Sequence, residues 1–478
     1  MSKNKLIALA IAAALASPAA YAVDVDATTP AVLPTNAMTG VATVQTNGAI
    51  NIVADATDNY LGRSTGYNVR VTLSDGAVFN TAFNPADVAF VSADAHTGTV
   101  TIAGGGQVGD NSITFSVVPN DGTTEGDGIT IAAGAFDLKN IGFLATGSNS
   151  LEIDVRVGDP VGGGELASRN GTPIISSQQA WVVTYSAGGN TAERIDVGAS
   201  SGKKLFSSTG AVNLADTAVF NTGSLMISLN PALTNPMGLD PAVATAPLVI
   251  SGADFSAFEG VGSVHLDDDA SCDGLGTVIA AVVSGDNTSA AIPSVTTAAA
   301  VNASPFICFA ANGTTIIEDQ DVDATVTVKQ VGMVDSPAFA DGDTLLPMLY
   351  NGAVKRVWHF NPSTNRDQQS YLRITNSSST AGLFTIDGTC DDASAGNPVT
   401  FTLGSGRSIL LTSGDIENGN ADKGLTGAMG ACTPVPAAGV TGKRRLVITG
   451  EVGSMEVQGF LRNGTSAGQI NTNVNNAD

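Results

Sequence analysis

The sequence has few basic and few aromatic residues. Lys and Arg number 21 against 44 Asp and Glu, which gives a formal net charge of −23 at pH 7. A chain this acidic is repelled by phosphate groups, so we do not expect it to bind nucleic acid. Aromatic residues make up 5% of the chain, including only 2 Trp and 6 Tyr. This scarcity argues against a cleft in which sugar rings stack on aromatic side chains.

Patterns of catalytic and metal-binding residues are also missing. No Cys-x-x-Cys occurs, and the three histidines are scattered: His96, His265 and His359. The stretches 198–202 and 464–468 match the Gly-x-Ser-x-Gly of a nucleophile elbow, but the first is not followed by a helical pattern and no His follows the second. The stretch 104–109 matches Gly-x-Gly-x-x-Gly, but a strand pattern follows it, so a hairpin loop fits better than a dinucleotide site. We therefore expect no enzymatic activity and no catalytic residues.

The first 22 residues have the features of a signal peptide. Lys3 and Lys5 make the start positive, Leu6–Ala16 is apolar but too short to span a bilayer, and Ala22 ends a small-x-small cleavage pattern. The mature chain is then expected to begin at Val23. No later apolar run is long enough to be a transmembrane segment, so we expect the protein to be exported and released from the inner membrane.

Alternating apolar and polar residues predict an all-β fold. The alternation is clear at Tyr67–Leu73, Ile113–Val117, Leu151–Val157 and Val322–Val328, and such a period of two places one strand face on a core. Turn residues separate these runs, and hardly any segment has the apolar stripe of a helix. We expect two or three antiparallel β-sandwich domains in tandem with little helix.

The length of the chain suggests about three domains of ~150 residues each. Residues 159–173, rich in Gly and Pro, are interpreted as a linker between a first sandwich at 23–158 and a second β domain at 174–334. A final β module is expected at 335–478. Within this division the segment 286–303 is expected to form a long loop or weak strands.

Four cysteines are available for disulfide bonds: Cys272, Cys308, Cys390 and Cys432. An even number of cysteines in an oxidising compartment favours disulfides, and four cysteines allow three pairings. We expect Cys272–Cys308 and Cys390–Cys432, because each pair lies within one predicted domain.

Two clusters of acidic residues are candidate Ca²⁺ sites, since calcium is bound by six to eight hard oxygen ligands that often come from loops. The first cluster consists of Asp267, Asp268, Asp269 and Asp273. The second consists of Glu318, Asp319, Asp321 and Asp323. Neither has the spacing of an EF-hand loop, and the alternative interpretation is that both are solvated acidic loops.

The segment from Trp358 to Gly430 resembles a C-terminal β module of exported proteins from marine gammaproteobacteria. The matching pieces are Asn361-Pro362, Asp367-Gln368-Gln369-Ser370, Leu372-Arg373-Ile374, Asn376, Leu411–Gly427 and Arg445-Leu446. Together with the signal peptide, the size and the acidity, this module makes the chain similar to the small S-layer proteins of such bacteria. Within the module, Arg373 and Glu417 are either a buried pair or two unrelated surface charges.

The resemblance implies a structural subunit of a bacterial surface layer, which self-assembles into a two-dimensional lattice over the outer membrane. The expected partners are other copies of the chain and, through divalent cations such as Ca²⁺, the phosphates of outer-membrane lipopolysaccharide. The expected location is the outside of the cell, on its surface. The main alternative is a monomeric cell-surface adhesin or glycan-binding protein, and a secreted hydrolase with an accessory module comes third.

Overall fold

The computed structural model describes residues 23–471 apart from short segments. These segments are 28–29, 39–40, 42, 148, 199–200, 236, 242, 261, 275–278, 297–303, 366, 433–441 and 464–469. The predicted signal peptide, residues 1–22, lies outside the described residues.

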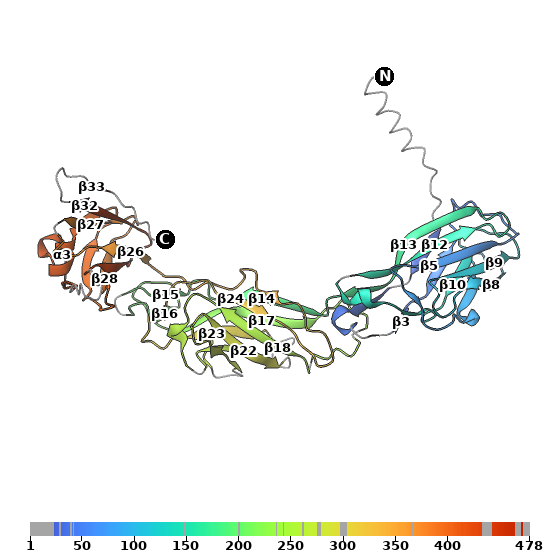
Figure 1. Ribbon diagram of the computed structural model, residues 1–478, viewed down its shortest axis with the longest axis horizontal. Coiled ribbons are helices and arrows are strands. Elements are labelled where there is room, and N and C mark those ends of the chain that lie inside the picture. The colour runs from blue at the N-terminus through green and yellow to red at the C-terminus, as the bar shows by residue number, and fades with distance from the viewer. Residues whose placement is uncertain are drawn as a thin grey trace, which may run out of the picture.

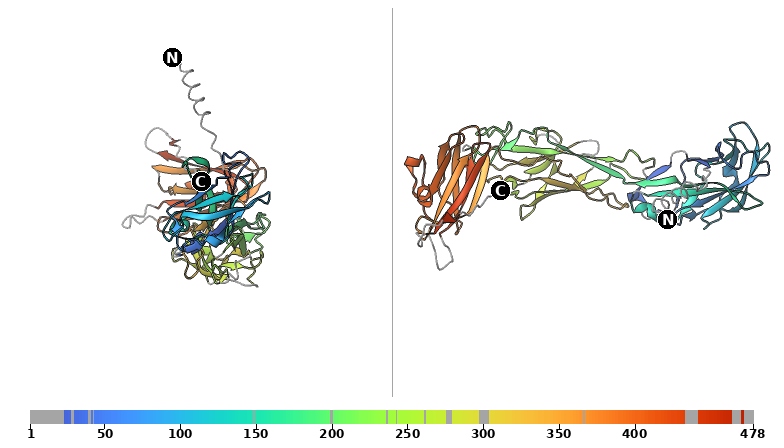
Figure 2. Two further views of the ribbon diagram at one scale, coloured as in Figure 1. Left: turned by 90° about the vertical axis from the view of Figure 1, so that its right-hand side faces the viewer. Right: turned by 90° about the horizontal axis from the view of Figure 1, so that it is seen from above.

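The chain forms three β bodies that follow one another in a row (Figure 1; Figure 2, right). We call them the N-terminal domain (residues 23–178), the middle domain (179–350) and the C-terminal domain (351–471). Helix is scarce in the described part, and the all-β prediction is confirmed. The helical elements there are η1 (Thr35–Ala37), η2 (Pro85–Asp87), η3 (Gly142–Ala145), η4 (Ser256–Phe258), α3 (Ser413–Asn418) and η5 (Ala421–Lys423).

The N-terminal domain contains sheets of six, four and three strands, in the orders β2-β13-β12-β5-β9-β8, β1-β4-β10-β7 and β3-β11-β6. The strands are β1 (Asp24–Ala27), β2 (Ala31–Pro34), β3 (Thr43–Gln45), β4 (Ile50–Val53), β5 (Tyr67–Leu73), β6 (Val78–Phe79), β7 (Val88–Val91), β8 (Gly98–Gly105), β9 (Ser112–Pro119), β10 (Gly128–Ile131), β11 (Asp137–Lys139), β12 (Ser150–Gly158) and β13 (Glu165–Gln178). Their inward residues, such as Val69, Phe115 and Ile153, are buried in one core, as the alternation predicted.

The predicted linker at 159–173 is wrong, because most of it belongs to the long strand β13. This strand pairs with β12 along most of its length and with β2, the latter in parallel. Its residues Ala167, Ile174 and Ile175 are buried in the N-terminal core. The glycine and proline that suggested a linker lie where the pairing with β12 is irregular, and such bulges tolerate Gly171 and Pro173 inside a strand.

The middle domain packs two five-stranded sheets, in the orders β14-β17-β23-β19-β20 and β21-β22-β18-β24-β25, beside a two-stranded sheet β15-β16. The strands are β14 (Trp181–Ala187), β15 (Arg194–Ile195), β16 (Phe206–Ser207), β17 (Val219–Leu229), β18 (Thr245–Ser251), β19 (Val264–Asp267), β20 (Ile279–Ala280), β21 (Val282–Val283), β22 (Ser289–Thr296), β23 (Phe306–Ala310), β24 (Asp323–Val326) and β25 (Phe339–Ala340). The predicted boundary at 334/335 is too early: β25 pairs with β24, and Leu345 and Met348 are buried in this core.

The C-terminal domain is a sandwich of two four-stranded sheets, β26-β31-β28-β29 and β30-β27-β32-β33. The strands are β26 (Ala353–Phe360), β27 (Gln368–Asn376), β28 (Gly382–Cys390), β29 (Val399–Leu403), β30 (Ser408–Thr412), β31 (Arg444–Gly450), β32 (Met455–Asn463) and β33 (Ile470–Asn471). The core between the sheets contains Leu372, Ile374, Phe384, Ile386 and Ile448.

The joint between the N-terminal and middle domains is held by the buried residue Asn36 of η1. Its backbone oxygen accepts from the Val334 amide at 3.0 Å, and its side-chain amide donates to the Val334 oxygen at 3.1 Å. Its Oδ1 accepts from the Ala180 amide at 3.3 Å. Val32 and Thr234 add a second reciprocal pair of hydrogen bonds, at 2.8 and 3.1 Å.

The joint between the middle and C-terminal domains is centred on Asn351. Its amide donates to the Ile195 oxygen at 3.0 Å, its Oδ1 accepts from the Val197 amide at 2.9 Å, and its Nδ2 donates to Asp196 Oδ1 at 3.0 Å. The next residue is Gly352, where a Cβ would lie 2.4 Å from Val197 Cγ2. Only glycine lets the two domains approach this closely.

Candidate functional sites

The structure brings three of the four residues of the first acidic cluster together at the end of β19. The carboxylates of Asp267, Asp268 and Asp269 lie within 4.8 Å of one another, while Asp273 is not part of this group. Asp267 is fully buried and accepts from the amides of Asp269 at 3.2 Å and Gly274 at 3.0 Å. Asp268 and Asp269 are exposed, so the group can offer hard oxygen ligands to a cation that approaches from solvent.

Asp269 is kept ionised by its neighbour Ser271. The side chain and the amide of Ser271 donate to Asp269 Oδ1 at 2.5 and 2.8 Å. These hydrogen bonds hold the pKa of the Asp269 carboxyl below its usual value. The carboxylate is therefore charged across the pH range in which calcium would bind.

The acidic loop is fixed to strand β23 by the predicted disulfide Cys272–Cys308, which the structure contains. Cys308 also lies near His265 and Asp267, and His265 Nε2 is 3.6 Å from Asp267 Oδ2. Because the Cys308 sulfur is used in the disulfide, it cannot act as a thiolate ligand, and this leaves only His265 and Asp267 of the group to bind a metal ion. The second predicted disulfide, Cys390–Cys432, is also present.

The structure does not bring the four residues of the second acidic cluster together into one group. Glu318 points to the C-terminal domain, where it forms an ion pair with Arg356 and accepts from the Tyr350 hydroxyl at 2.7 Å. The other three carboxylates are exposed and alternate with buried residues along one segment; we call Asp319, Asp321 and Asp323 the Asp319 stripe. An extended chain spaces alternate residues by about 6–7 Å, so these three carboxylates are spread along the segment and do not converge as those of Asp267, Asp268 and Asp269 do.

Arg373 and Glu417 do not form a buried pair. Glu417 instead lies 3.7 Å from Arg444, and both side chains are about 2% exposed. Arg444 also donates to the Gly430 oxygen at 2.6 Å, while Glu417 accepts from the Ser363 amide at 3.1 Å. Burial lowers the pKa of the Arg444 guanidinium, and the Glu417 carboxylate opposes this shift.

Arg373 lies on the outer face of the sheet β30-β27-β32-β33. This face was not predicted as a site from the sequence. Tyr371 is opposite Phe460, and Arg373 is opposite Leu410. With Arg462 of β32 these side chains line a shallow depression of about 710 Å³, which we call the arginine face. Its lining consists of Tyr371, Arg373, Ser408, Ile409, Leu410, Phe460 and Arg462. Leu410 is exposed and Phe460 is half-buried. The sequence signal for this face was the alternation of aromatic residues with arginines, Tyr371 with Arg373 and Phe460 with Arg462.

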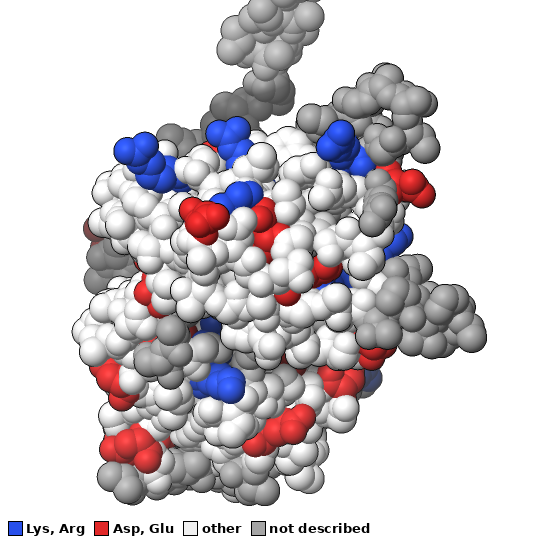
Figure 3. All heavy atoms as spheres, turned by 90° about the vertical axis from the view of Figure 1, so that its left-hand side faces the viewer, with Lys and Arg blue, Asp and Glu red and all other residues white. Residues whose placement is uncertain are grey.

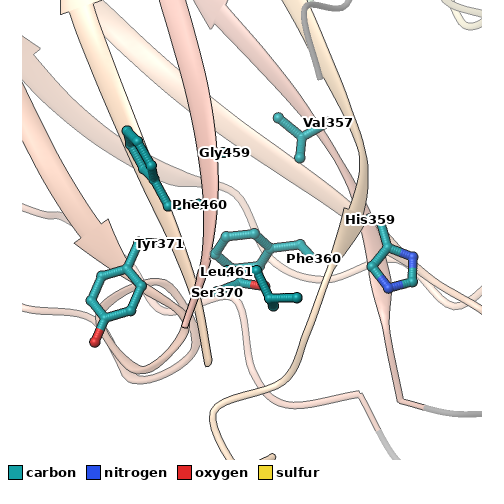
Figure 4. A pocket seen from close by; sticks show the side chains of 8 residues that line it. All are labelled: Val357, His359, Phe360, Ser370, Tyr371, Gly459, Phe460 and Leu461. Carbon is teal, nitrogen blue, oxygen red and sulfur yellow. The ribbon is translucent and has the colours of Figure 1, made fainter. Parts of the chain in front are cut away.

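A second, much smaller pocket lies beside the arginine face, between β26 and the strands β27 and β32. Figure 4 shows Tyr371 and Phe460 on one side of it and His359 on the other. Its volume is about 80 Å³, which is room for a few water molecules only. Burial, with Lys443 nearby, lowers the pKa of the His359 imidazole. This pocket is too small for an organic ligand.

Charge is distributed unevenly along the row of domains. Residues 23–178 contain 16 acidic and 5 basic residues, and residues 179–350 contain 18 acidic and 4 basic residues. Residues 351–478 contain 10 of each, so the C-terminal part is neutral. Figure 3, which looks at the C-terminal domain from its end, shows Lys and Arg gathered along the upper edge, at the height of β27 and β32 in Figure 1, and mostly Asp and Glu below.

The glycine motifs have no catalytic setting in the described part of the chain. Residues 104–109 end β8 and lead into β9, and the two strands form an antiparallel hairpin as predicted. The motif at 464–468 lies outside the described residues, and so do residues 199–200 of the motif at 198–202. No described helix is long and apolar enough to cross a membrane.

In comparisons with known proteins, no family model matches the chain and no curated protein matches it by sequence. Among solved structures, the chain is similar to the crystal structure of the major pilin subunit of Bacillus cereus. That match covers 71% of this chain and 84% of the pilin chain, at 9% sequence identity and a TM-score of 0.22. At that score the similarity carries no argument about function.

Proposed function

We propose that this protein is a structural subunit of a bacterial surface layer, and that copies of it assemble into a two-dimensional lattice over the outer membrane. The observation that carries the proposal is the row of three β-sandwich domains with bonded joints (Figure 1). A subunit that only tiles a surface needs a stiff body that holds its contact surfaces at fixed positions, and no active site.

The two joints support the required stiffness. Asn36 makes four hydrogen bonds across the first joint and Asn351 makes four across the second. Each hydrogen bond contributes about 0.5–1.5 kcal/mol net, and a buried group left without its partner costs about 1–3 kcal/mol. Bending at either joint would break several of these bonds at once. The ion pair between Glu318 and Arg356 adds a further contact at the second joint.

Calcium fits the proposal as an assembly cofactor. Copies with a net negative charge repel one another when they pack side by side, and this repulsion grows as salt is removed. A divalent cation at Asp267, Asp268 and Asp269 would lower the repulsion locally. Cations held by exposed carboxylates would also link the protein to the phosphates of lipopolysaccharide. The two disulfides are those of a protein that folds in an oxidising compartment outside the cytoplasm.

The test is the assembly state of purified residues 23–478 in Ca²⁺ and in EDTA, measured by sedimentation velocity. We expect large assemblies in Ca²⁺ that dissolve in EDTA and form again when Ca²⁺ is restored. The variant Asp268→Asn/Asp269→Asn should need more Ca²⁺ to assemble. The control Asp94→Asn/Asp121→Asn, which removes two exposed charges from the N-terminal domain, should not. A chain that stays monomeric in both buffers would refute the proposal.

A monomeric glycan-binding surface protein is the second candidate. It is favoured by one observation, the side-by-side Tyr371 and Phe460 on an open sheet face, because aromatic rings are common contacts for sugars. The sedimentation experiment separates the two candidates, since an adhesin of this kind stays monomeric with or without Ca²⁺.

A further inference from the structure

We propose that the arginine face of one copy docks on the Asp319 stripe of a second copy. This inference rests on the proposed function, because it names the contact through which copies assemble. The face is Tyr371, Arg373, Ser408, Ile409, Leu410, Phe460 and Arg462 on the C-terminal domain. The stripe is Asp319, Asp321 and Asp323 on the middle domain.

The arginine face has the composition of a protein interface without an occupant. Leu410 is 50% exposed, and it lies beside the pair Tyr371 and Phe460. Arg373 and Arg462 have no hydrogen bond or ion pair from their side chains among the residues that the structure describes. Aromatic and arginine side chains around an apolar centre are the groups most enriched in protein interfaces and in their energetic hot spots.

The spacing of the arginines matches the spacing of the aspartates. Arg462 is opposite Gln369, which is four residues before Arg373 on β27. The two arginines are therefore about 13 Å apart along the strand direction, on neighbouring strands. Asp319 and Asp323 are also four residues apart, on a segment whose exposed and buried residues alternate as in a strand, so they too are about 13 Å apart. Both ends of the stripe can thus face an arginine at the same time.

The distribution of charge points to a second copy as the partner. The middle domain has 18 acidic and 4 basic residues, while the C-terminal part is neutral and presents unpaired arginines. Opposite charges on the two surfaces steer their association, and the like charges of two middle domains suppress contacts between those domains. Within one chain, the C-terminal residue that contacts Glu318, next to the stripe, is Arg356 of β26. Because β26 belongs to the other sheet of the sandwich, the arginine face is left for the stripe of a second copy.

The contact joins two different surfaces of the subunit, and such a contact can be repeated from copy to copy. An interface between unlike patches is heterologous, so each copy keeps one free face and one free stripe after binding. Repetition then gives open rows of copies unless the rotation between neighbours closes a ring. Rows of this kind are the element from which a two-dimensional layer is built.

The test is a charge reversal with rescue, measured by sedimentation velocity on purified residues 23–478. The face variant is Arg373→Glu/Arg462→Glu and the stripe variant is Asp319→Lys/Asp323→Lys. All four positions are exposed, so thermal melts should match the wild type. Each variant alone should associate at least about 100-fold more weakly, because like charges face each other. An equimolar mixture of the two should recover association to within about tenfold of wild type, since the reversed charges are again opposite.

The matched control is Arg169→Glu/Arg445→Glu, which changes the net charge by the same amount at two exposed arginines away from the face. It should assemble like the wild type. A wild type that never assembles refutes the proposed function itself. A wild type and a face variant that assemble equally well refute the docking inference alone, and so does a mixture that shows no recovery.

A second measurement tests whether the arginine face binds an anionic glycan instead of a second copy. The face variant and the wild type are mixed with vesicles that contain lipopolysaccharide, in EDTA, and co-sedimentation is measured. Equal binding of both proteins is expected. A face variant that keeps normal self-assembly but loses vesicle binding would assign the face to the glycan and overturn the inference.

Discussion

The disulfide Cys272–Cys308 should carry much of the stability of the middle domain. It joins residues 36 positions apart, and both cysteines are buried. In a chain-entropy treatment, a cross-link that closes a loop of this length removes enough freedom from the unfolded chain to stabilise the fold by about 4 kcal/mol at 25 °C. The variant Cys272→Ala/Cys308→Ala should therefore lower the free energy of unfolding of this domain by about 4 kcal/mol.

The change can be followed through Trp181. This residue is 2% exposed in the core of the middle domain, so its fluorescence shifts when that domain unfolds. The other tryptophan, Trp358, is 58% exposed in the C-terminal domain and should change little. With a urea dependence of about 2 kcal/mol per M, a loss of about 4 kcal/mol moves the urea midpoint down by about 2 M.

The matched control is Cys390→Ala/Cys432→Ala, which opens a disulfide of similar separation, 42 positions, in the C-terminal domain. It should leave the Trp181 transition unchanged. A shift below about 0.5 M for the first variant, against the about 2 M expected, would refute the reasoning. An equal shift for both variants would show that the two domains unfold together rather than separately.

Three further predictions concern buried and acidic groups. Burial raises the pKa of the Glu193 carboxyl from its usual 4.5 to about 7, so the folded middle domain holds a proton that the unfolded chain releases. The free energy of unfolding should therefore fall as the pH rises from about 4.5 to 7. Urea titrations at pH 5 and 8 should show that Glu193→Gln removes up to about 3 kcal/mol of this fall. Glu417→Ala should destabilise the C-terminal domain by about 3–5 kcal/mol in calorimetry, because it leaves the buried Arg444 without its partner; an unchanged transition would contradict the pair. Calcium at 100 times its dissociation constant should stabilise the middle domain by about 2.7 kcal/mol, and Asp268→Asn/Asp269→Asn should abolish the effect.

The all-β fold could be predicted because a strand that buries every second residue has alternating apolar and polar residues in its sequence. Val69 and Phe115 alternate with polar neighbours in the sequence and are buried in the structure. The disulfide pairing was predictable too, since each pair lies close in sequence within one domain. The boundary at residues 159–173 could not be read correctly, because Gly171 and Pro173 have the same appearance in a linker and in a bulged strand.

The candidate sites were predictable only in part. Asp267, Asp268 and Asp269 are adjacent in sequence, so their proximity followed from the chain itself. The buried pair of Glu417 and Arg444 depends on how two distant segments pack, and this was not visible in the sequence. A hint existed, because Arg444 shares its strand face with Leu446 and Ile448.

The measurement that tests the central claim most directly is electron microscopy of purified residues 23–478, dialysed into Ca²⁺ and imaged in negative stain. The account predicts flat sheets whose Fourier transforms show discrete reflections, with rows of repeating three-domain subunits. Single rods or disordered aggregates, with no reflections in Ca²⁺ at any protein concentration, would contradict it.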